Sequence, residues 1–425
     1  MIFLATQLPR EVLFSHILIL AFLLILGLII GRICERFNVP SITGYILSGI
    51  IVGTILICLG KEQIFYDLKF ISSIGLGILA YEIGTRLHMK KVKPILFEVS
   101  LITILQVIFV VGFVFIGLFL AKAKLEVALI LGAIALATSP ATMIAISRKF
   151  RAKGHLTDAL MPHIGFDDIV GVIIFSIAIS YASQISSGAT YGVESILVRP
   201  LLEIVCSILA GALLGFLLGL FIRIANKKSR SKNELYLEET IFSIILIVAL
   251  TYADIEIFGI EFELSAILTP MFMGIFYTNM VPKDLRKEID SAIDGFTPPF
   301  ILAFFGLIGV ELIVAFQEGV ANLKAVLLYS AIYIVLRVVG KTLGAMVGGK
   351  ICHAPKTICN YLGVCLLSQA TVSLGMAQVV LNSFDKEIGQ TVLIVVLISA
   401  AVFELFGPNM TQYFLKKACE IEIPS

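Results

Sequence analysis

Charged residues are scarce in this chain of 425 residues, of which 15% are Asp, Glu, Lys or Arg and 59% are hydrophobic. Soluble domains carry roughly 25% charged residues. That difference, with a mean hydropathy of +1.02, excludes a soluble enzyme. A bilayer core about 30 Å thick needs roughly 20 apolar residues per spanning helix. The chain therefore has enough apolar residues for about a dozen spans, and little remains for a soluble domain.

Other features that the sequence lacks remove further classes of protein. The net charge is only +2, and no basic stretch is interleaved with aromatic residues, which argues against nucleic-acid binding. The seven cysteines include no CxxC pair, so neither a zinc site nor a disulfide framework is predicted. No basic region precedes the first apolar run, which is expected to be a retained helix rather than a signal peptide. No nucleotide-binding domain is expected after the last apolar run, so no cofactor is predicted.

About thirteen apolar runs are long enough to cross a membrane. They are 12–31, 41–59, 68–86, 95–121, 125–147, 159–183, 200–224, 237–257, 262–281, 296–316, 324–349, 357–381 and 388–414. None alternates as a barrel strand does, and a spanning backbone must satisfy its own hydrogen bonds. The sequence therefore predicts an all-α polytopic membrane protein.

Lys and Arg predict the orientation of these spans, because short basic loops stay on the cytoplasmic side. Every second loop is basic, and the intervening loops carry only scattered bases. The basic loops are those near 32–36, 86–93, 148–153, 223–232, 283–287 and 350–356, followed by the tail at 416–417. One intervening loop is acidic and holds Asp254, Glu256, Glu261 and Glu263. The prediction is a multi-pass protein of the cell (inner) membrane with its N-terminus outside and its C-terminus in the cytoplasm.

Two adjacent aspartates, Asp167 and Asp168, lie inside the sixth run. Ionisable residues deep in a span are costly and are candidates for a functional site. Adjacent positions differ by about 100° around a helix, so one carboxylate can face a packed partner and the other a water-filled cavity. The alternative is a pair of first-turn acids favoured by the helix dipole. That alternative is weaker because the basic loop ends near Asp158, more than two turns earlier.

The eleventh run carries Arg337 and Lys341, which are four residues apart and so share one helix face. At about 1.5 Å per residue, Asp168 and Lys341 both fall roughly 12–15 Å from the cytoplasmic boundary. They can therefore meet. The alternative for Lys341 is a lysine that snorkels to the interface, although its stem reaches only part of that distance.

The fifth and twelfth runs each carry a polar cluster near the middle. These clusters are Thr138, Ser139 and Pro140 in the fifth run and Ser368, Gln369 and Thr371 in the twelfth. Pro140 removes a helical N–H and clashes with the preceding turn. Interrupted helices at corresponding positions of two halves point to the binding site of a transporter. The alternative for each cluster alone is hydrogen bonding between packed helices.

With these residues the chain resembles the cation/proton antiporter superfamily, which has the sodium/proton exchanger fold, in its bacterial branch with paired aspartates. The resemblance covers nearly the whole chain. It includes SITGYILSGIIVG in the second run, ATSP at 137–140, GFDD at 165–168, PFILAFFGLIGVEL near 299–312 and GKTLGA at 340–345. The chain departs from the symmetric pattern because the break in the twelfth run has no proline.

The resemblance implies inverted repeats, two crossing broken helices and a homodimer. It implies a core (ion-transport) domain at 95–183 and 324–414, a dimerisation scaffold at 12–86 and 237–316, and a linking helix at 200–224. Asp168 would be the carboxylate that exchanges a metal cation for protons. Asp167 would pair with Lys341, and Arg337 is a further candidate charge partner.

The predicted function is secondary active antiport of a monovalent cation, expected to be Na⁺, for protons across the lipid bilayer, with a role in pH homeostasis. Burial favours the protonated form of a carboxylate and a nearby cation favours the ionised form, so proton and cation compete for one site. The exchange is expected to be electrogenic. The alternatives are a sodium-coupled organic-solute symporter and a K⁺/H⁺ efflux transporter of related fold. An intramembrane aspartyl protease is disfavoured because adjacent aspartates on one helix point about 100° apart.

His163 lies one turn before Asp167, and its role stays open between two interpretations. It could tune the response to pH, or it could cap the helix near the membrane interface. The second is favoured.

Overall fold

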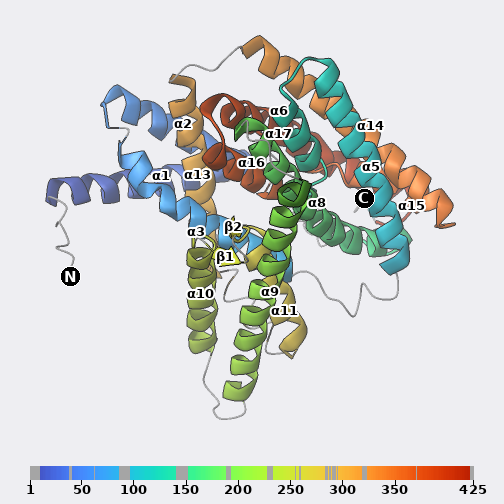
Figure 1. Ribbon diagram of the computed structural model, residues 1–425, viewed down its shortest axis with the longest axis horizontal. Helices are drawn as coiled ribbons and strands as arrows, with labels where there is room; N and C mark the ends of the chain where they lie inside the picture. Colours follow the sequence, from blue (N-terminus) through green and yellow to red (C-terminus); the bar gives the residue numbers. More distant parts are fainter. Residues whose placement is uncertain are drawn as a thin grey trace. The chain divides into compact units, whose positions relative to one another are not determined.

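The computed structural model describes residues 10–37, 41–61, 63–85, 96–139, 152–187, 193–226, 233–253, 255–257, 260–282, 295–317, 323–369 and 371–421, with positions 286, 289 and 293. The described chain is almost entirely helical (Figure 1). Its helices are α1 (Arg10–Arg36), α2 (Ser41–Cys58), α3 (Gln63–Thr85), α5 (Leu96–Leu120), α6 (Leu125–Ile134), α8 (His155–Ser187), α9 (Val193–Asn226), α10 (Asn233–Leu250), α11 (Leu268–Met280), α13 (Pro298–Gln317), α14 (Leu323–Ile351), α15 (Lys356–Cys365), α16 (Thr371–Ser383) and α17 (Lys386–Lys417).

The apolar runs account for these helices, and the prediction of an all-α polytopic membrane protein is confirmed. Eight of the described helices are long and apolar enough to cross a membrane. Three shorter helices, Leu125–Ile134, Pro298–Val314 and Val372–Ser383, are also apolar. Outward-facing side chains such as Phe22, Ile25 and Leu209 are large and hydrophobic, as expected for helices that have lipid as their solvent.

The fifth and twelfth predicted spans are interrupted. The twelfth is divided into α15 and α16, with a non-helical segment at 366–369 between them. In the fifth, α6 ends at Ile134 and residues 135–139 leave the helix. Pro140 lies outside the described residues, but a proline ring clashes with the carbonyl one turn before it.

One segment differs from the prediction of two spans at 237–257 and 262–281. Helix α10 ends at Leu250, and a short antiparallel hairpin of β1 (Ile255–Ile257) and β2 (Ile260–Phe262) precedes α11. Its register pairs Glu256 with Glu261. Isoleucine and glutamate alternate here with a period of two, which favours a strand rather than a helix, and the acidic residues oppose insertion into the bilayer.

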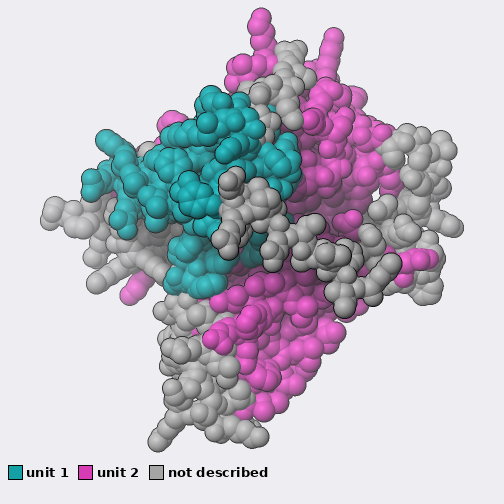
Figure 2. Space-filling view, turned by 90° about the vertical axis from the view of Figure 1, so that its left-hand side faces the viewer, with its two compact units in different colours: residues 1–76, 294–319 teal, residues 77–293, 320–425 magenta. Residues whose placement is uncertain are grey.

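The chain divides into two compact units (Figure 2). Unit 1 is Met1–Leu76 with Asp294–Gly319, and unit 2 is Gly77–Ile293 with Val320–Ser425. In unit 1, an apolar cluster joins α1, α2, α3 and α13, and Lys69 pairs with Glu311 at 3.0 Å. The candidate site lies within unit 2. The predicted core and scaffold are defined by their movement relative to each other, and this division stays a prediction.

Within unit 2, α14 packs along α5 at close range (Figure 1). Three glycines of α14 at a spacing of four residues, Gly340, Gly344 and Gly348, face Val110, Gln106 and Ile102 of α5. A Cβ atom added at Gly344 would lie 2.7 Å from the Cα atom of Gln106. Small residues at this spacing let two backbones approach in a membrane, and this approach holds the turn that carries Lys341.

Candidate functional site

The two helix breaks meet in space. The backbone N–H of Ser139, in the segment after α6, donates to the carbonyl oxygen of Ser368, in the segment after α15, at 2.8 Å. Helices α6 and α15 therefore both end close to this point. The last carbonyls of a helix have no partner within it, and they carry a partial negative charge. The crossing accordingly needs donors and positive charge from elsewhere in the fold.

Arg337 of α14 supplies both. Its Nε donates to the carbonyl of Ala135 at 2.8 Å and its Nη2 to that of Ala137 at 2.7 Å, while Nη1 donates to the carbonyl of Leu367 at 2.6 Å. The guanidinium is fully buried and lies 4.4 Å from the ring centre of Phe403 in α17. A planar fork of donors suits this task. Arg337 was expected as a charge partner of the aspartates, but its hydrogen bonds go to these carbonyls of both breaks.

Lys341, one turn further along α14, is the residue that pairs with an aspartate. Its ammonium lies 2.7 Å from Oδ2 of Asp167 and donates to the hydroxyl of Thr138 at 2.9 Å. The other carboxylate oxygen of Asp167 accepts the hydroxyl proton of Thr103, in α5, at 2.9 Å. Lysine and aspartate are both fully buried. Lys341 is therefore not a snorkelling lysine.

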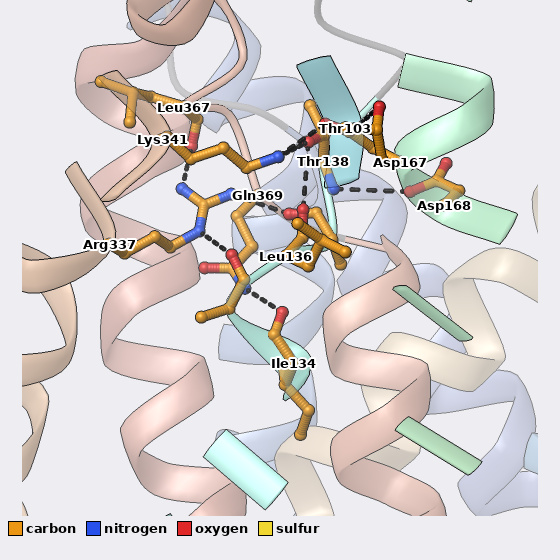
Figure 3. Close-up of polar contacts among 12 residues, drawn as sticks. Thr103, Ile134, Leu136, Thr138, Asp167, Asp168, Arg337, Lys341, Leu367 and Gln369 are labelled. Carbon is orange, nitrogen blue, oxygen red and sulfur yellow. Dashed lines mark hydrogen bonds and ion pairs between the residues drawn. The ribbon is translucent and has the colours of Figure 1, made fainter. Parts of the chain in front are cut away.

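Asp168 faces the same break from the neighbouring position of α8 (Figure 3). Its Oδ1 accepts the backbone N–H of Thr138 at a long 3.4 Å, and the side chain is 1% exposed. Thr138 thus lies between the two aspartates, with its hydroxyl on the side of Lys341 and its N–H on the side of Asp168. The structure brings together Asp167, Asp168, Lys341 and Thr138, as the sequence predicts.

The remaining predicted residues of the breaks differ in their placement. The side-chain amide of Gln369 donates to the hydroxyl of Tyr333 at 2.7 Å and to the carbonyl of Ile134 at 3.3 Å, so it braces the end of α6. Ser368 is fully buried and joins the breaks through its backbone, as described. Ser139 is also buried. Thr371 begins α16, but the side chain of Thr371 and all of Pro140 lie outside the described residues.

His163 does not cap the helix at the interface, so the favoured interpretation is wrong. Helix α8 begins at His155, and His163 lies two turns inside it with no exposed surface. Its Nδ1 lies 2.8 Å from the carbonyl oxygen of Ala159, in the preceding turn. The physical reason is its position in the helix. A helix cap lies at the first turn, where backbone N–H groups lack partners, and His163 is two turns further along.

A family model described as the transmembrane sodium/hydrogen exchanger matches residues 17–414. The chain belongs to this family. Three proteins illustrate the similarity. A probable Na⁺/H⁺ antiporter 2 of Methanocaldococcus jannaschii is 25% identical over 318 residues, which is 72% of each chain. The ammonium/H⁺ antiporter subunit AmhT of Alkalihalophilus pseudofirmus is 22% identical over 403 residues, or 94% of this chain and 95% of AmhT. The structure of the sodium proton antiporter MjNhaP1 from M. jannaschii at pH 8 superposes with a TM-score of 0.75 at 16% identity, covering 96% of this chain and 99% of MjNhaP1.

This family consists of transporters, so the chain is a membrane transporter and not an enzyme. In this exchanger-family protein the ion pair of Asp167 and Lys341 is fully buried. Removing one partner of a buried ion pair costs about 3–5 kcal/mol, whereas replacing both by apolar residues is often neutral. The Asp167–Lys341 pair is therefore weak evidence for stability. A charge pair of this kind fits better with a functional role.

Two residues of this candidate site were not predicted from the sequence. Thr103 fixes one oxygen of Asp167, and Tyr333 fixes the amide of Gln369. Both are fully buried polar residues within long apolar helices. Their polarity inside an apolar run was a signal in the sequence. Their hydrogen-bond partners could not be predicted, because Thr103 and Tyr333 are distant in sequence from Asp167 and Gln369.

Proposed function

We propose that this chain is a secondary active antiporter that exchanges a monovalent cation for protons by alternating access. The observation that carries the proposal is a buried carboxylate, Asp168, next to an Asp167–Lys341 ion pair at the meeting point of two helix breaks. Burial favours the neutral carboxylic acid and a bound cation favours the carboxylate. Protons and cations therefore compete for Asp168, and each displaces the other.

Asp168 is proposed as the main cation ligand, with oxygens of the break completing the coordination. Hard cations bind carboxylate, hydroxyl and carbonyl oxygens, and the turn at Thr138 offers such groups. Na⁺ is the expected cation. The relatives include a probable Na⁺/H⁺ antiporter and an ammonium/H⁺ antiporter subunit, so Na⁺, Li⁺, K⁺ and NH₄⁺ all belong in the assay.

The finer parts of the proposal concern charge, movement and placement. We infer that more than one proton is traded for each cation and that Asp167 with Lys341 handles the additional proton. We also propose that residues 95–183 and 324–414 move as a core against a scaffold at 12–86 and 237–316, joined by the helix at 200–224. The proposed assembly is a homodimer in the cell membrane, with the C-terminus in the cytoplasm.

The proposed function is tested with Asp168→Asn in reconstituted vesicles. The amide keeps the shape of the side chain, but it neither takes up a proton reversibly nor neutralises a cation. Proton release on adding each cation, read with a pH dye, is expected for the wild type and lost in Asp168→Asn. Asp158→Asn is the matched control, because Asp158 is an exposed aspartate in the first turn of the same helix.

Two outcomes would count against the proposal. Near-normal exchange by Asp168→Asn would remove Asp168 from the carrier role. If the wild type moved no protons with any of these cations but accumulated an organic solute with Na⁺, the chain would be a symporter.

A further inference from the structure

His163 is a buried base whose tautomer is set by the fold. Its Nδ1 lies 2.8 Å from the carbonyl oxygen of Ala159. A carbonyl oxygen only accepts hydrogen bonds, so Nδ1 carries the proton and Nε2 holds a lone pair. Among the described residues Nε2 has no hydrogen-bond partner, and the side chain is fully buried. The imidazole therefore presents a basic nitrogen that can accept a proton within unit 2.

The ring lies on the same face of α8 as Asp167. Residues 163 and 167 are four apart, which places them one turn or about 6 Å apart along the helix axis. Pro162, next to the histidine, lies inside α8 and has no N–H to donate to the preceding turn. This turn is consequently less constrained by backbone hydrogen bonds, and the histidine ring bonds one of its carbonyls.

Asp167, one turn along α8 from His163, bonds Thr103 of α5 at 2.9 Å and Lys341 of α14 at 2.7 Å. Glu98 lies five residues before Thr103 on α5, or about 7.5 Å along the helix axis. An apolar cluster that includes Ile164, next to His163, also contains Ile102 from α5, Ala345 from α14 and Leu362 from α15. Burial of the ring opposes its protonation, whereas the neighbouring Asp167 carboxylate favours it and the Lys341 ammonium opposes it. The imidazole therefore lies in a field that depends on the state of the Asp167–Lys341 pair.

Glu98 connects this position to the end of the helices. It is in the first turn of α5 and is partly exposed. It also acts on Cys352, in the turn directly after α14, where partial burial and the Glu98 carboxylate together raise the pKa of the thiol. Glu98, His163 and Asp167 thus form a series of titratable groups that runs from the helix ends, through the apolar cluster, to the buried site.

We propose that His163 is a proton-transfer residue that carries protons between Glu98 and the Asp167–Lys341 pair. The inference rests on the proposed antiport. The Lys341 ammonium gives one proton to Nε2, so the lysine becomes a neutral amine and the ring an imidazolium. The new N–H bond at Nε2 then breaks and its proton passes to the Glu98 carboxylate, while Nδ1 keeps its proton on the carbonyl of Ala159. Glu98 releases the proton to water and is a carboxylate again. Only N–H and O–H bonds change. The same steps in reverse carry a proton from Glu98 to the site. Histidine suits this task because an imidazole nitrogen can both accept and donate a proton.

The test compares two rates in reconstituted vesicles for wild type, His163→Gln and His155→Gln. One rate is proton movement driven by a Na⁺ gradient. The other is exchange of labelled Na⁺ for Na⁺ at equal pH on both sides, which requires no net proton movement. His155 is the matched control because it is an exposed histidine at the start of the same helix. A positioned acid–base group contributes about 10²–10⁴-fold, so the ratio of proton movement to Na⁺ self-exchange should fall at least about tenfold in His163→Gln and stay at the wild-type value in His155→Gln.

Glu98→Gln provides a second variant, because a partly exposed residue tolerates an isosteric change. Groups that act in series give a double variant no slower than the slower single variant, whereas independent sites add in free energy. Multiplying effects in the double variant, or a ratio in His163→Gln equal to that of His155→Gln, would overturn the relay. Absence of proton exchange by the wild type with each of Na⁺, Li⁺, K⁺ and NH₄⁺ would instead refute the proposed antiport, and so the two failures are distinguishable.

Discussion

The guanidinium of Arg337 lies where α6 and α15 both end. The segments that follow these ends also need donors for their buried carbonyls, and a single side chain reaches three of them, on Ala135, Ala137 and Leu367. Lys341 and Arg337 are one turn apart on α14, yet they bind different groups. The lysine pairs with a titratable carboxylate, while the arginine bonds groups that never ionise. The structure thus separates a candidate transport charge from a charge that holds the crossing together.

Replacing Arg337 with glutamine is expected to destabilise the protein strongly. Each buried carbonyl left without a donor costs about 1–3 kcal/mol, so the unfolding midpoint of the purified protein should fall clearly. Arg337→Lys should lie between glutamine and wild type, because it keeps the charge but loses the planar fork. Arg223→Gln, at an exposed position in the last turn of α9, is the control. Equal midpoints for the variants at 337 and 223 would contradict the assigned role.

At the scale of elements, the contact between α5 and α14 brings Thr103 and Lys341 to Asp167. It depends on glycines at which an added Cβ atom would collide with the α5 backbone. Gly344→Ala should therefore lower the unfolding midpoint and slow exchange, since Lys341 lies in the preceding turn. Gly112→Ala is the matched control, because a Cβ added there meets no atom within 4 Å. Equal stability of the two variants would show that the helices can separate without cost.

The start of α8 is held by the C-terminal segment. The carboxylate of Glu420 accepts the backbone N–H groups of Leu156 at 2.8 Å and Thr157 at 2.7 Å, as well as the hydroxyl of Thr157 at 2.7 Å. Its carbonyl oxygen accepts the N–H of Lys153 at 3.0 Å. This is a helix cap supplied by a residue far along the chain, on the helix that carries both aspartates.

Removing this cap should loosen the first turn of α8. A side-chain cap contributes about 0.5–2 kcal/mol, and a negative charge at a helix N-terminus contributes further. Glu420→Ala is therefore expected to increase hydrogen exchange at residues 155–158, with a smaller effect on the rest of α8. Glu35→Ala, at an exposed position in α1, is the control. Unchanged protection at residues 155–158 in Glu420→Ala would count against the cap.

At the scale of the whole molecule, the proposed orientation in the membrane can be tested by chemical labelling of native cysteines. Cys58 and Cys419 are free and exposed. The pattern of basic loops predicts that Cys58 faces outside and Cys419 the cytoplasm. In intact cells, a membrane-impermeant thiol reagent should label a variant that retains only Cys58. A variant that retains only Cys419 should react only after the cells are opened. The reverse pattern would invert the proposed topology.

Electrogenic exchange is the second prediction for the whole molecule. Moving one net charge couples about 2.3 kcal/mol per 100 mV to the cycle. An imposed membrane potential at equal pH should therefore drive exchange in vesicles. Lys341→Gln should reduce or abolish this response, because the Asp167–Lys341 pair is the proposed source of the additional proton. A wild-type rate indifferent to potential would rule out electrogenic exchange.

Most of the helices, the two breaks and the candidate site residues could be predicted from the apolar runs and the polar residues within them. A window of about 20 apolar residues is enough to specify a spanning helix, and a charge inside such a window stands out whatever surrounds it. Asp167, Asp168 and Lys341 were therefore identifiable without a fold. The hairpin at 255–262 was not identified, because its period-two pattern is short and lies between two apolar runs.

The partners of these residues could be assigned only from the folded protein. Lys341 and Asp167 are 174 positions apart, Arg337 and Ala135 are 202 apart, and Leu156 and Glu420 are 264 apart. No local pattern specifies such partners, because each depends on how helices pack after insertion. The same reason explains His163. Its position one turn before Asp167 could be read from the sequence, but its burial and its tautomer follow from the packing of α8 against its neighbours.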